Sequence, residues 1–448
     1  MARTEDCRPI LDHCRPLRSP GLRNIEGAMR LIMGVGRATK GVIEYLKRVG
    51  LEYLVYDDDR EKAGDHYTDS LEGIEEIIIS PGFPDSHPMV QKACLRGIPI
   101  IDEIEFTHKE IMGLVIAVTG TNGKSTTAAI VANILKRRFQ VFLGGNIAPG
   151  NPFSQALLDP PYDCYVLEVS SFQLERIRDF HPRVSILLNI FPDHLDRHRT
   201  FEQYIKAKFN IFKNQDQTDH AILNHDDETI RSRVDEIISK KHFFSSIHGD
   251  AYVDRGMIVI NGMEVIPVDE LPLKGEYNIK NVLAAGLASS VMAIPVEMIR
   301  EGIKSFTGLK FRMETILKKG GIKFINNSMC TNPKAAIESL KAVDHPYVVI
   351  MGGKEKDFLR DDYPEYVAKS SDYAVVIGAN RFRIEEVFRN LGFDRFVLAG
   401  EMDEAVRKAN TIAGPGWTII LNPGYASQDM FKDFIDRGMR FNDAVATI

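Results

Sequence analysis

A glycine-rich loop between an apolar strand and a helix constrains the fold of this chain more than any other feature. The loop reads Val118-Thr119-Gly120-Thr121-Asn122-Gly123-Lys124-Ser125-Thr126, after the apolar run Leu114 to Thr119 and before the predicted helix Ser125 to Arg138. In that context a Gly-Lys-Ser match predicts a phosphate site, because backbone N–H groups and the helix N-terminus face the anion. Val118 stands where the general motif has its first glycine, so the loop is a tighter variant.

This loop predicts a site for a nucleoside triphosphate, and it does not say whether the energy drives motion, switching or synthesis. Lys124 is expected to reach the outer phosphates, and the Ser125 hydroxyl is a candidate Mg²⁺ ligand. The predicted ATP-binding residues of the loop are Gly120, Thr121, Asn122, Gly123, Lys124, Ser125 and Thr126.

The elements on either side of the loop predict an α/β fold. Short β-rich runs alternate with helical stretches from Leu31 onward, a pattern typical of parallel sheets. We predict a helix near Phe201 to Asn214 and a hairpin-like stretch near Tyr252 to Val268. Beyond Gly308 the predicted strands are Ile322 to Asn326, Tyr347 to Met351, Tyr373 to Ile377, Arg395 to Leu398 and Thr418 to Leu421. At about 150 residues per domain, 448 residues suggest three domains. We expect a disordered extension over residues 1–28, a Rossmann-like domain over 29–112, a central P-loop-type ATPase domain with a parallel sheet over 113–308, and a second Rossmann-like domain over 309–448.

Composition excludes several other classes of protein. Lys and Arg number 56 against 62 Asp and Glu, so the net charge of -6 gives no global basic surface for nucleic acid. No apolar run is long enough to span a membrane, residues 1–28 lack the apolar core of a signal peptide, and five scattered cysteines fit a reducing compartment. A soluble cytoplasmic protein that acts on small molecules is expected. A metal site at Cys7, His13 and Cys14 is disfavoured, because the spacing fits no zinc pattern.

Polar clusters follow two further strands of the central block. Leu167-Glu168-Val169-Ser170-Ser171-Phe172-Gln173 follows one strand, and Asn189-Ile190-Phe191-Pro192-Asp193-His194 follows the next. Ligands of open α/β sheets bind at the carboxyl ends of the strands, so Glu168 and His194 should face the phosphates held by Lys124. We predict them to be metal ligands, with a helix-capping carboxylate and an ordinary loop histidine as the alternatives.

Four motifs together resemble the Mur ligases of peptidoglycan precursor synthesis. They are T-G-T-N-G-K-S-T, L-E-V-S-S-F-Q-L-E, N-I-F-P-D-H-L-D-R-H and Y-I-K-A-K-F (Tyr204 to Phe209). The second and third are typical of the branch that adds D-glutamate, whereas the glycine loop alone would also suit folylpolyglutamate synthase. The resemblance extends from about Leu31 to the C-terminus.

The resemblance implies an ATP- and Mg²⁺-dependent ligase, expected as a monomer. Such an enzyme adds D-glutamate to UDP-N-acetylmuramoyl-L-alanine through an acyl phosphate. A ligase for another amino acid, such as L-glutamate, or for another precursor remains an alternative. So does a nucleotide-binding regulator that has lost catalysis.

The resemblance also implies site residues in all three domains. Residues 29–112 would bind the UDP end of the substrate, and residues 309–448 would bind the amino acid and close over ATP. The implied catalytic residues are Lys124, Glu168, His194, Lys208 and Arg312, and the implied metal ligands are Ser125, Glu168, His194 and Lys208, the last as a carbamylated lysine. Further ATP contacts are Asn278, Asn281, Arg312 and Asn327. Substrate contacts are Gly36, Arg37, Asp57, Gly82, Asn146, Ser170, Gln173, Thr331, Lys356, Ser427 and Phe434, with Lys354 as the alternative to Lys356.

One segment departs from the family pattern. Asn326-Asn327-Ser328-Met329-Cys330-Thr331-Asn332 stands where the family typically reads N-D-S-K-A-T-N. Asn327 replaces an acid and Met329 replaces a lysine, so the local net charge is unchanged. Two hypotheses follow: an ion pair exchanged for neutral residues at little cost, or altered chemistry near the acyl phosphate or the amino acid.

Overall fold

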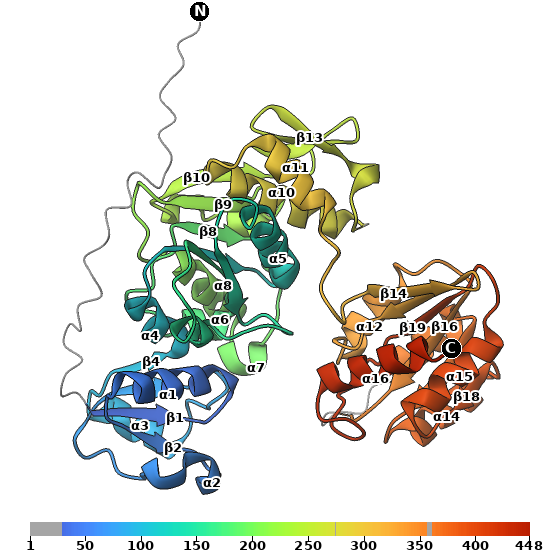
Figure 1. Ribbon diagram of the computed structural model, residues 1–448, viewed down its shortest axis with the longest axis horizontal. Helices are drawn as coiled ribbons and strands as arrows, with labels where there is room; N and C mark the ends of the chain where they lie inside the picture. Colours follow the sequence, from blue (N-terminus) through green and yellow to red (C-terminus); the bar gives the residue numbers. More distant parts are fainter. Residues whose placement is uncertain (1–28, 274, 356–360) are drawn as a thin grey trace, which may run out of the picture. The chain divides into compact units, whose positions relative to one another are not determined.

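The computed structural model describes residues 29–273, 275–355 and 361–448 (Figure 1). Its contacts divide the chain into one compact unit that ends at Thr307 and a second that runs from Gly308 to Ile448. The predicted extension 1–28 and the predicted site residue Lys356 lie outside the described residues. In the part of the chain that is described, no helix combines the length and apolarity needed to cross a bilayer.

The first unit contains two sheets. The smaller sheet has four parallel strands, in the order β2 (Tyr53–Tyr56), β1 (Met29–Met33), β3 (Ile74–Ile79) and β4 (Ile100–Asp102). Its two central strands contain the fully buried apolar runs Leu31 to Met33 and Ile77 to Ile79, which suit a sheet covered on both faces. The helices of this part are α1 (Arg37–Val49), α2 (Arg60–Ala63), α3 (Pro88–Leu95) and α4 (Glu103–Glu110).

The larger sheet has nine strands. Their order is β13 (Met263–Pro267), β12 (Met257–Ile260), β11 (Ala251–Asp254), β10 (Lys240–Phe244), β9 (His220–Asn224), β8 (Val184–Leu187), β5 (Leu114–Thr119), β7 (Cys164–Glu168) and β6 (Val141–Gly145). From β6 to β11 all pairings are parallel, and β11 to β13 form an antiparallel meander. The hairpin predicted near Tyr252 to Val268 is therefore confirmed.

Helices follow the strands of the larger sheet and position its loops. They are α5 (Lys124–Leu135), α6 (Ser171–Leu174), α7 (Leu195–His198), α8 (Phe201–Phe209), α9 (Glu228–Arg231), α10 (Glu276–Val291) and α11 (Val296–Lys304). The predicted helix Phe201 to Asn214 ends earlier, because α8 tightens into a 3₁₀ turn at Asn210–Phe212. Helix α5 is apolar on nearly all sides and packs against α10 and α11, so it is buried in the unit.

The second unit is built on a six-stranded sheet. Its order is β14 (Glu314–Lys319), β15 (Ile322–Asn326), β19 (Thr418–Leu421), β16 (Tyr347–Gly352), β17 (Tyr373–Ile377) and β18 (Phe396–Leu398). The five strands predicted from sequence are present. The edge strand β14, antiparallel to β15, was missed because its exposed polar residues Thr315, Lys318 and Lys319 give no buried-strand signal. The helices are α12 (Pro333–Leu340), α13 (Asp362–Ser370), α14 (Arg381–Asn390), α15 (Met402–Ile412) and α16 (Phe434–Ala446).

Buried carboxylates on helix α4 tie the two sheets of the first unit together. Glu105 accepts hydrogen bonds from the backbone N–H groups of Arg178, Asp179 and Phe180 at 2.8–3.0 Å. Glu103 accepts a hydrogen bond from the backbone N–H of Ser154, in the 3₁₀ segment Phe153–Leu157 that follows β6. Burial raises the pKa of Glu103 to about 7.

We expect this buried carboxyl to make the first unit less stable at alkaline pH. A raised pKa in the folded state stabilises the protein fully below the ordinary value near 4.5, and this stability is lost as pH rises through about 7. The loss amounts to about 3 kcal/mol. Glu103→Gln keeps the acceptor for Ser154 and should flatten the pH dependence of urea unfolding between pH 5 and 8. Exposed Glu52→Gln is the control, and an unchanged slope in Glu103→Gln would contradict the expectation.

Candidate nucleotide and metal site

The phosphate loop joins strand β5 to helix α5 through two glycines with positive φ. Gly120 has φ 152° and Gly123 has φ 86°. The left-handed backbone at Gly123 favours glycine, and a Cβ atom there would also meet the side-chain oxygen of Asn281. The N–H groups that follow the turn precede the N-terminus of a twelve-residue helix, an arrangement suited to an anion.

Asn189, shortly after the neighbouring strand β8, forms hydrogen bonds with the backbone of the phosphate loop. Its backbone and side-chain oxygens accept hydrogen bonds from the N–H groups of Thr121 and Asn122, both at 2.9 Å, and its amide donates to the Asn122 carbonyl at 3.1 Å. Asn189 was not among the site residues predicted from sequence. Its position directly after a buried strand, beside the phosphate loop, was the signal that could have found it.

Ser125 and Glu168 form the core of the predicted metal site. The Ser125 hydroxyl donates to one carboxylate oxygen of Glu168 at 2.6 Å, and the Asn146 amide reaches the other at 3.3 Å. Strand β7 ends at Glu168, which is buried, and pairs with β5, which leads into the loop. The side chain of Lys124 folds over the loop, with Nζ 2.9 Å from the Thr121 carbonyl.

Lys208 lies beneath the same loop. It is 2% exposed, and its Nζ donates to the Gly120 carbonyl at 2.8 Å. Burial lowers the pKa of Lys208 to about 6, and the nearby charge of Lys124 acts in the same direction. The Tyr204 ring lies 4.7 Å from this nitrogen, and the Tyr204 hydroxyl lies 3.0 Å from Oγ1 of Thr121.

His194 is less tightly held than the other predicted metal ligands. Its backbone is left-handed, with φ 52°, and about half of its side chain is exposed. The ring contacts Phe172 at 4.9 Å between centroids, and Nε2 lies 3.6 Å from Asp193. Within the described residues no three His, Cys, Asp or Glu side chains gather as a ready metal site. The oxygens of Ser125 and Glu168 are nevertheless the hard donors that Mg²⁺ prefers.

Two asparagines of helix α10, Asn278 and Asn281, lie next to helix α5 where it leaves the phosphate loop. The Thr127 hydroxyl donates to the Asn281 carbonyl oxygen at 3.2 Å, and the Asn281 amide donates to Asn278 at 3.3 Å. Both asparagines are buried. The structure therefore brings these two predicted ATP contacts to the phosphate loop through helix α5.

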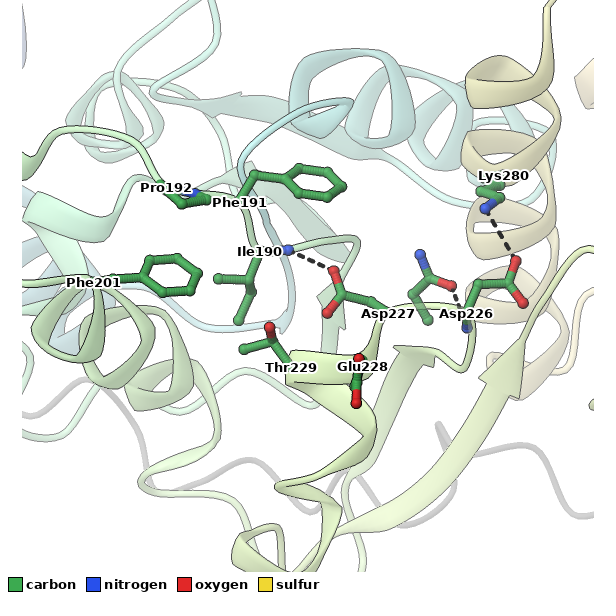
Figure 2. A pocket seen from close by; sticks show the side chains of 10 residues that line it. Ile190, Phe191, Pro192, Phe201, Asp226, Asp227, Glu228, Thr229 and Lys280 are labelled. Atoms are coloured by element: carbon green, nitrogen blue, oxygen red, sulfur yellow. Dashed lines mark hydrogen bonds and ion pairs between the residues drawn. The ribbon is translucent and has the colours of Figure 1, made fainter.

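A pocket of about 360 Å³ opens beside the loop (Figure 2). Lys280 of α10 forms an ion pair with Asp226 at 3.0 Å, and Asp227 accepts a hydrogen bond from the Ile190 N–H at 2.8 Å. Phe191 joins the pocket to the phosphate loop, because its N–H donates to the Thr121 hydroxyl at 3.0 Å. The lining residues are Ile190, Phe191, Pro192, Phe201, Asn224, Asp226, Asp227, Glu228, Thr229 and Lys280.

In the smaller sheet, the predicted substrate residues surround the turn after β1. Asp57 accepts a hydrogen bond from the Val35 N–H at 2.7 Å, and Gly36 caps helix α1, while Gly82 lies in the loop after β3. The Arg37 guanidinium donates to the carbonyls of Ile147 and Gly150 at 3.1 and 3.3 Å. Arg37 thus links this sheet to the loop that carries Asn146.

Ser170 and Gln173 lie at the start of helix α6. The Ser170 hydroxyl accepts a hydrogen bond from the Gln173 N–H at 3.3 Å, and the Gln173 side chain accepts one from the Ser170 N–H at 3.0 Å. This is a capping box, which fixes the turn directly after Glu168. Both predicted substrate contacts therefore also have a structural role.

The second unit carries the remaining predicted residues. Arg312 donates to the Met329 sulfur at 3.4 Å, and Asn327 is buried at the end of β15. Thr331 precedes α12, Ser427 follows β19, and Phe434 is the first residue of α16. Buried Arg437 holds this edge together, since its guanidinium donates to Ser328 and to the Tyr425 carbonyl at 2.8–3.1 Å.

Asn327 has a hydrogen-bond partner for each part of its side-chain amide. Its amide donates to Asn422 Oδ1 at 2.8 Å and to the Ser339 hydroxyl at 3.0 Å, and its oxygen accepts from the Met313 N–H at 3.0 Å. The Asn422 amide is itself bonded to the Ala336 carbonyl, at 3.0 Å. An aspartate at 327 would place its carboxylate against the Asn422 side-chain oxygen, which is also an acceptor.

We expect Asn327→Asp to destabilise the second unit by about 1–3 kcal/mol, because two buried acceptors would face each other. Urea unfolding measures this loss, and Ser339→Ala reports the separate contribution of the hydroxyl.

The double variant Asn327→Asp, Met329→Lys tests the hypothesis of altered chemistry near the acyl phosphate or the amino acid. Unchanged kinetics with D-glutamate in that variant would eliminate altered chemistry at these positions.

Sequence comparison with known proteins identifies relatives over most of the chain. A family model described as the Mur ligase middle domain matches residues 118–289, and one described as the Mur ligase, glutamate ligase domain matches residues 311–424. A UDP-N-acetylmuramoylalanine–D-glutamate ligase from Alkaliphilus oremlandii is 36% identical and covers 93% of this chain and 98% of its own length. The enzyme of the same name from Lachnoclostridium phytofermentans is 35% identical, covering 94% and 98%.

Solved structures show the same fold. UDP-N-acetylmuramate-alanine ligase MurC from Thermotoga maritima has a TM-score of 0.60 at 19% identity, covering 94% of this chain and 99% of its own. A MurF ligase from the same organism, in complex with ADP, has a TM-score of 0.56 at 17% identity, covering 87% and 92%. At these identities the likeness concerns the α/β architecture with its parallel-rich sheets.

Proposed function

The chain belongs to the Mur ligase family, and from that premise we propose that it joins D-glutamate to UDP-N-acetylmuramoyl-L-alanine at the expense of ATP. The observation that carries this proposal is the close contact of Ser125 with Glu168 beside Lys124, at a phosphate loop within a chain that matches D-glutamate ligases over more than nine-tenths of its length. In a cell this reaction supplies a precursor of peptidoglycan.

The reaction starts from a carboxylate, which is a poor electrophile until it is phosphorylated. The γ-phosphoryl group of ATP passes to the substrate carboxylate, the amine of glutamate attacks the acyl phosphate, and ADP and phosphate are released. Lys124 and the loop N–H groups hold the phosphates in line, and Arg312 is proposed to neutralise the charge that develops. Mg²⁺, held by Ser125 and Glu168 with His194 nearby, would screen the phosphate oxygens.

Lys208 is proposed to act as a carbamate. Reaction of its neutral amine with CO₂ forms an N–C bond and releases a proton, so a buried neutral amine becomes an anion with two oxygen donors. Burial beneath the loop, next to Lys124, supports this proposal, because an uncompensated ammonium is unfavourable there.

The remaining residues are assigned by region. We propose that residues 29–112 bind the UDP end of the substrate through Gly36, Arg37, Asp57 and Gly82, with Asn146, Ser170 and Gln173 facing the sugar-peptide. Residues 309–448 would bind the amino acid through Thr331, Lys356, Ser427 and Phe434. The protein is proposed to act as a cytoplasmic monomer on small molecules.

The test is ADP release by the purified chain with ATP, Mg²⁺ and UDP-N-acetylmuramoyl-L-alanine, in the presence of D-glutamate, L-glutamate or no amino acid. Turnover that requires D-glutamate, with a product mass equal to substrate plus one glutamyl residue, supports the proposal. Turnover with L-glutamate alone would assign another ligase of this family. Nucleotide binding without turnover would favour the regulatory alternative.

A further inference from the structure

One buried histidine lies between the elements that carry the proposed chemistry, although the mechanism above does not use it. His198, the last residue of helix α7, is 3% exposed. Its Nδ1 lies 3.0 Å from Glu175 Oε1, and its Nε2 lies 3.0 Å from the Ser171 hydroxyl. A carboxylate only accepts, so Nδ1 carries a hydrogen that it donates to Glu175, and Nε2 shares a hydrogen bond with the Ser171 hydroxyl, which can donate or accept. These two bonds fix the orientation of the ring.

The ring of His198 also packs against two aromatic side chains. It stacks on Phe172 with centroids 5.4 Å apart, and its edge meets Tyr204 at 5.2 Å. Arg197 covers Phe172 at 4.4 Å and reaches Glu175 at 3.4 Å. The histidine therefore sits in a packed group whose members come from α6, α7 and α8.

Each aromatic neighbour of His198 contacts a group assigned to the reaction. Phe172 touches the His194 ring at 4.9 Å. Tyr204 lies 3.0 Å from the Thr121 hydroxyl in the phosphate loop and 4.7 Å from Lys208 Nζ. A single side chain thus separates His198 from His194, from the phosphate loop and from Lys208.

We propose that His198 is a positioning residue for the ligase reaction. It sets the places of Phe172 and Tyr204, and through them those of His194, Thr121 and Lys208, while its bond to Ser171 anchors the turn after Glu168. This role rests on the proposed function, since it presupposes that those groups hold the phosphates and the metal.

Two substitutions separate the ring from its hydrogen bonds. His198→Phe keeps an aromatic ring and removes both bonds, whereas the amide of His198→Gln can still reach the Nε2 position and accept from Ser171. We expect kcat to fall about 10- to 100-fold in His198→Phe and to recover partly in His198→Gln, because small displacements of reacting groups are costly. The Mg²⁺ concentration for half-maximal rate should rise about threefold or more, while the KM for D-glutamate stays within about twofold.

His220→Asn is the matched control. His220 is a similarly buried histidine on β9 that contacts His242 at 2.9 Å, away from this network. Its loss should leave kcat and the Mg²⁺ dependence near the wild-type values. If His198→Phe lowered the thermal midpoint and kcat but left the Mg²⁺ dependence unchanged, His198 would support only the fold, and the positioning role would be overturned.

Ser171→Ala keeps the test decisive if His198→Phe does not fold. It removes only the hydroxyl that His198 holds, and its effect should be non-additive with that of His198→Gln in a double-mutant cycle. Wild-type-like kcat and Mg²⁺ dependence in these variants, with the wild type active, would overturn the positioning role alone. An inactive wild type in the same assay would instead overturn the proposed function together with this inference.

Discussion

Replacing Lys124 with methionine is expected to lower kcat about 10²- to 10³-fold. A preorganised positive charge at a transferring phosphoryl group contributes most in the transition state, and its removal costs rates of this order. Lys124 is the first residue of helix α5 and the single lysine between its bounds, and its Nζ lies 2.9 Å from the Thr121 carbonyl of the loop. ADP release with both substrates saturating measures the effect.

Lys136→Met is the matched control for Lys124. Lys136 caps the opposite end of the same helix and is exposed. It should retain wild-type kcat, and both variants should unfold at the wild-type temperature. If Lys124→Met kept more than about a third of the wild-type rate, the assignment of this loop to catalysis would be wrong.

The second large effect is expected at Lys208. Lys208→Met should lower kcat about 10²-fold or more, because methionine cannot supply oxygen ligands beneath the loop. The thermal midpoint should stay the same or rise, since the variant no longer buries an amine whose pKa is lowered to about 6. Loss of activity without loss of stability distinguishes a functional lysine from one that only supports the fold.

Lys206→Met provides the comparison on the same helix. Lys206 is exposed on α8 and should tolerate the change. Mass spectrometry of the native protein, with and without added bicarbonate, measures the carbamate directly. A Lys208→Met variant with a near-normal rate would contradict both the carbamate and the metal role.

The family and the phosphate loop could be predicted from sequence because their signals are local. The loop needs glycines where φ is positive, a lysine and a hydroxyl at fixed spacing, and an apolar strand before them. The strands of the second unit were likewise predicted from continuous apolar runs, except β14. That edge strand packs too few of its side chains to carry such a run.

The places of the individual site residues were less accessible to sequence reasoning. His194 and Glu168 belong to similar polar clusters after neighbouring strands, yet Glu168 is buried against Ser125 and His194 is half exposed. Asn189 and His198 belong to the polar segment after the second of these strands, where the sequence assigned no role in the site to either residue. Their hydrogen-bond partners lie 67 and 27 residues away in the chain. The spacing of residues within a sequence motif does not predict such contacts.

The sequence by itself determined that this chain is an α/β protein with a nucleotide loop and the motifs of a ligase family, because those features depend on short-range geometry and hydrophobic pattern. Only the tertiary structure decided which polar groups share an environment. It placed the ammonium of Lys208 beneath Gly120, gave Asn327 the amide partner Asn422, and set His198 between Phe172 and Tyr204. The physical reason is that burial, charge and hydrogen bonding depend on neighbours in space, which the packing of distant strands and helices selects.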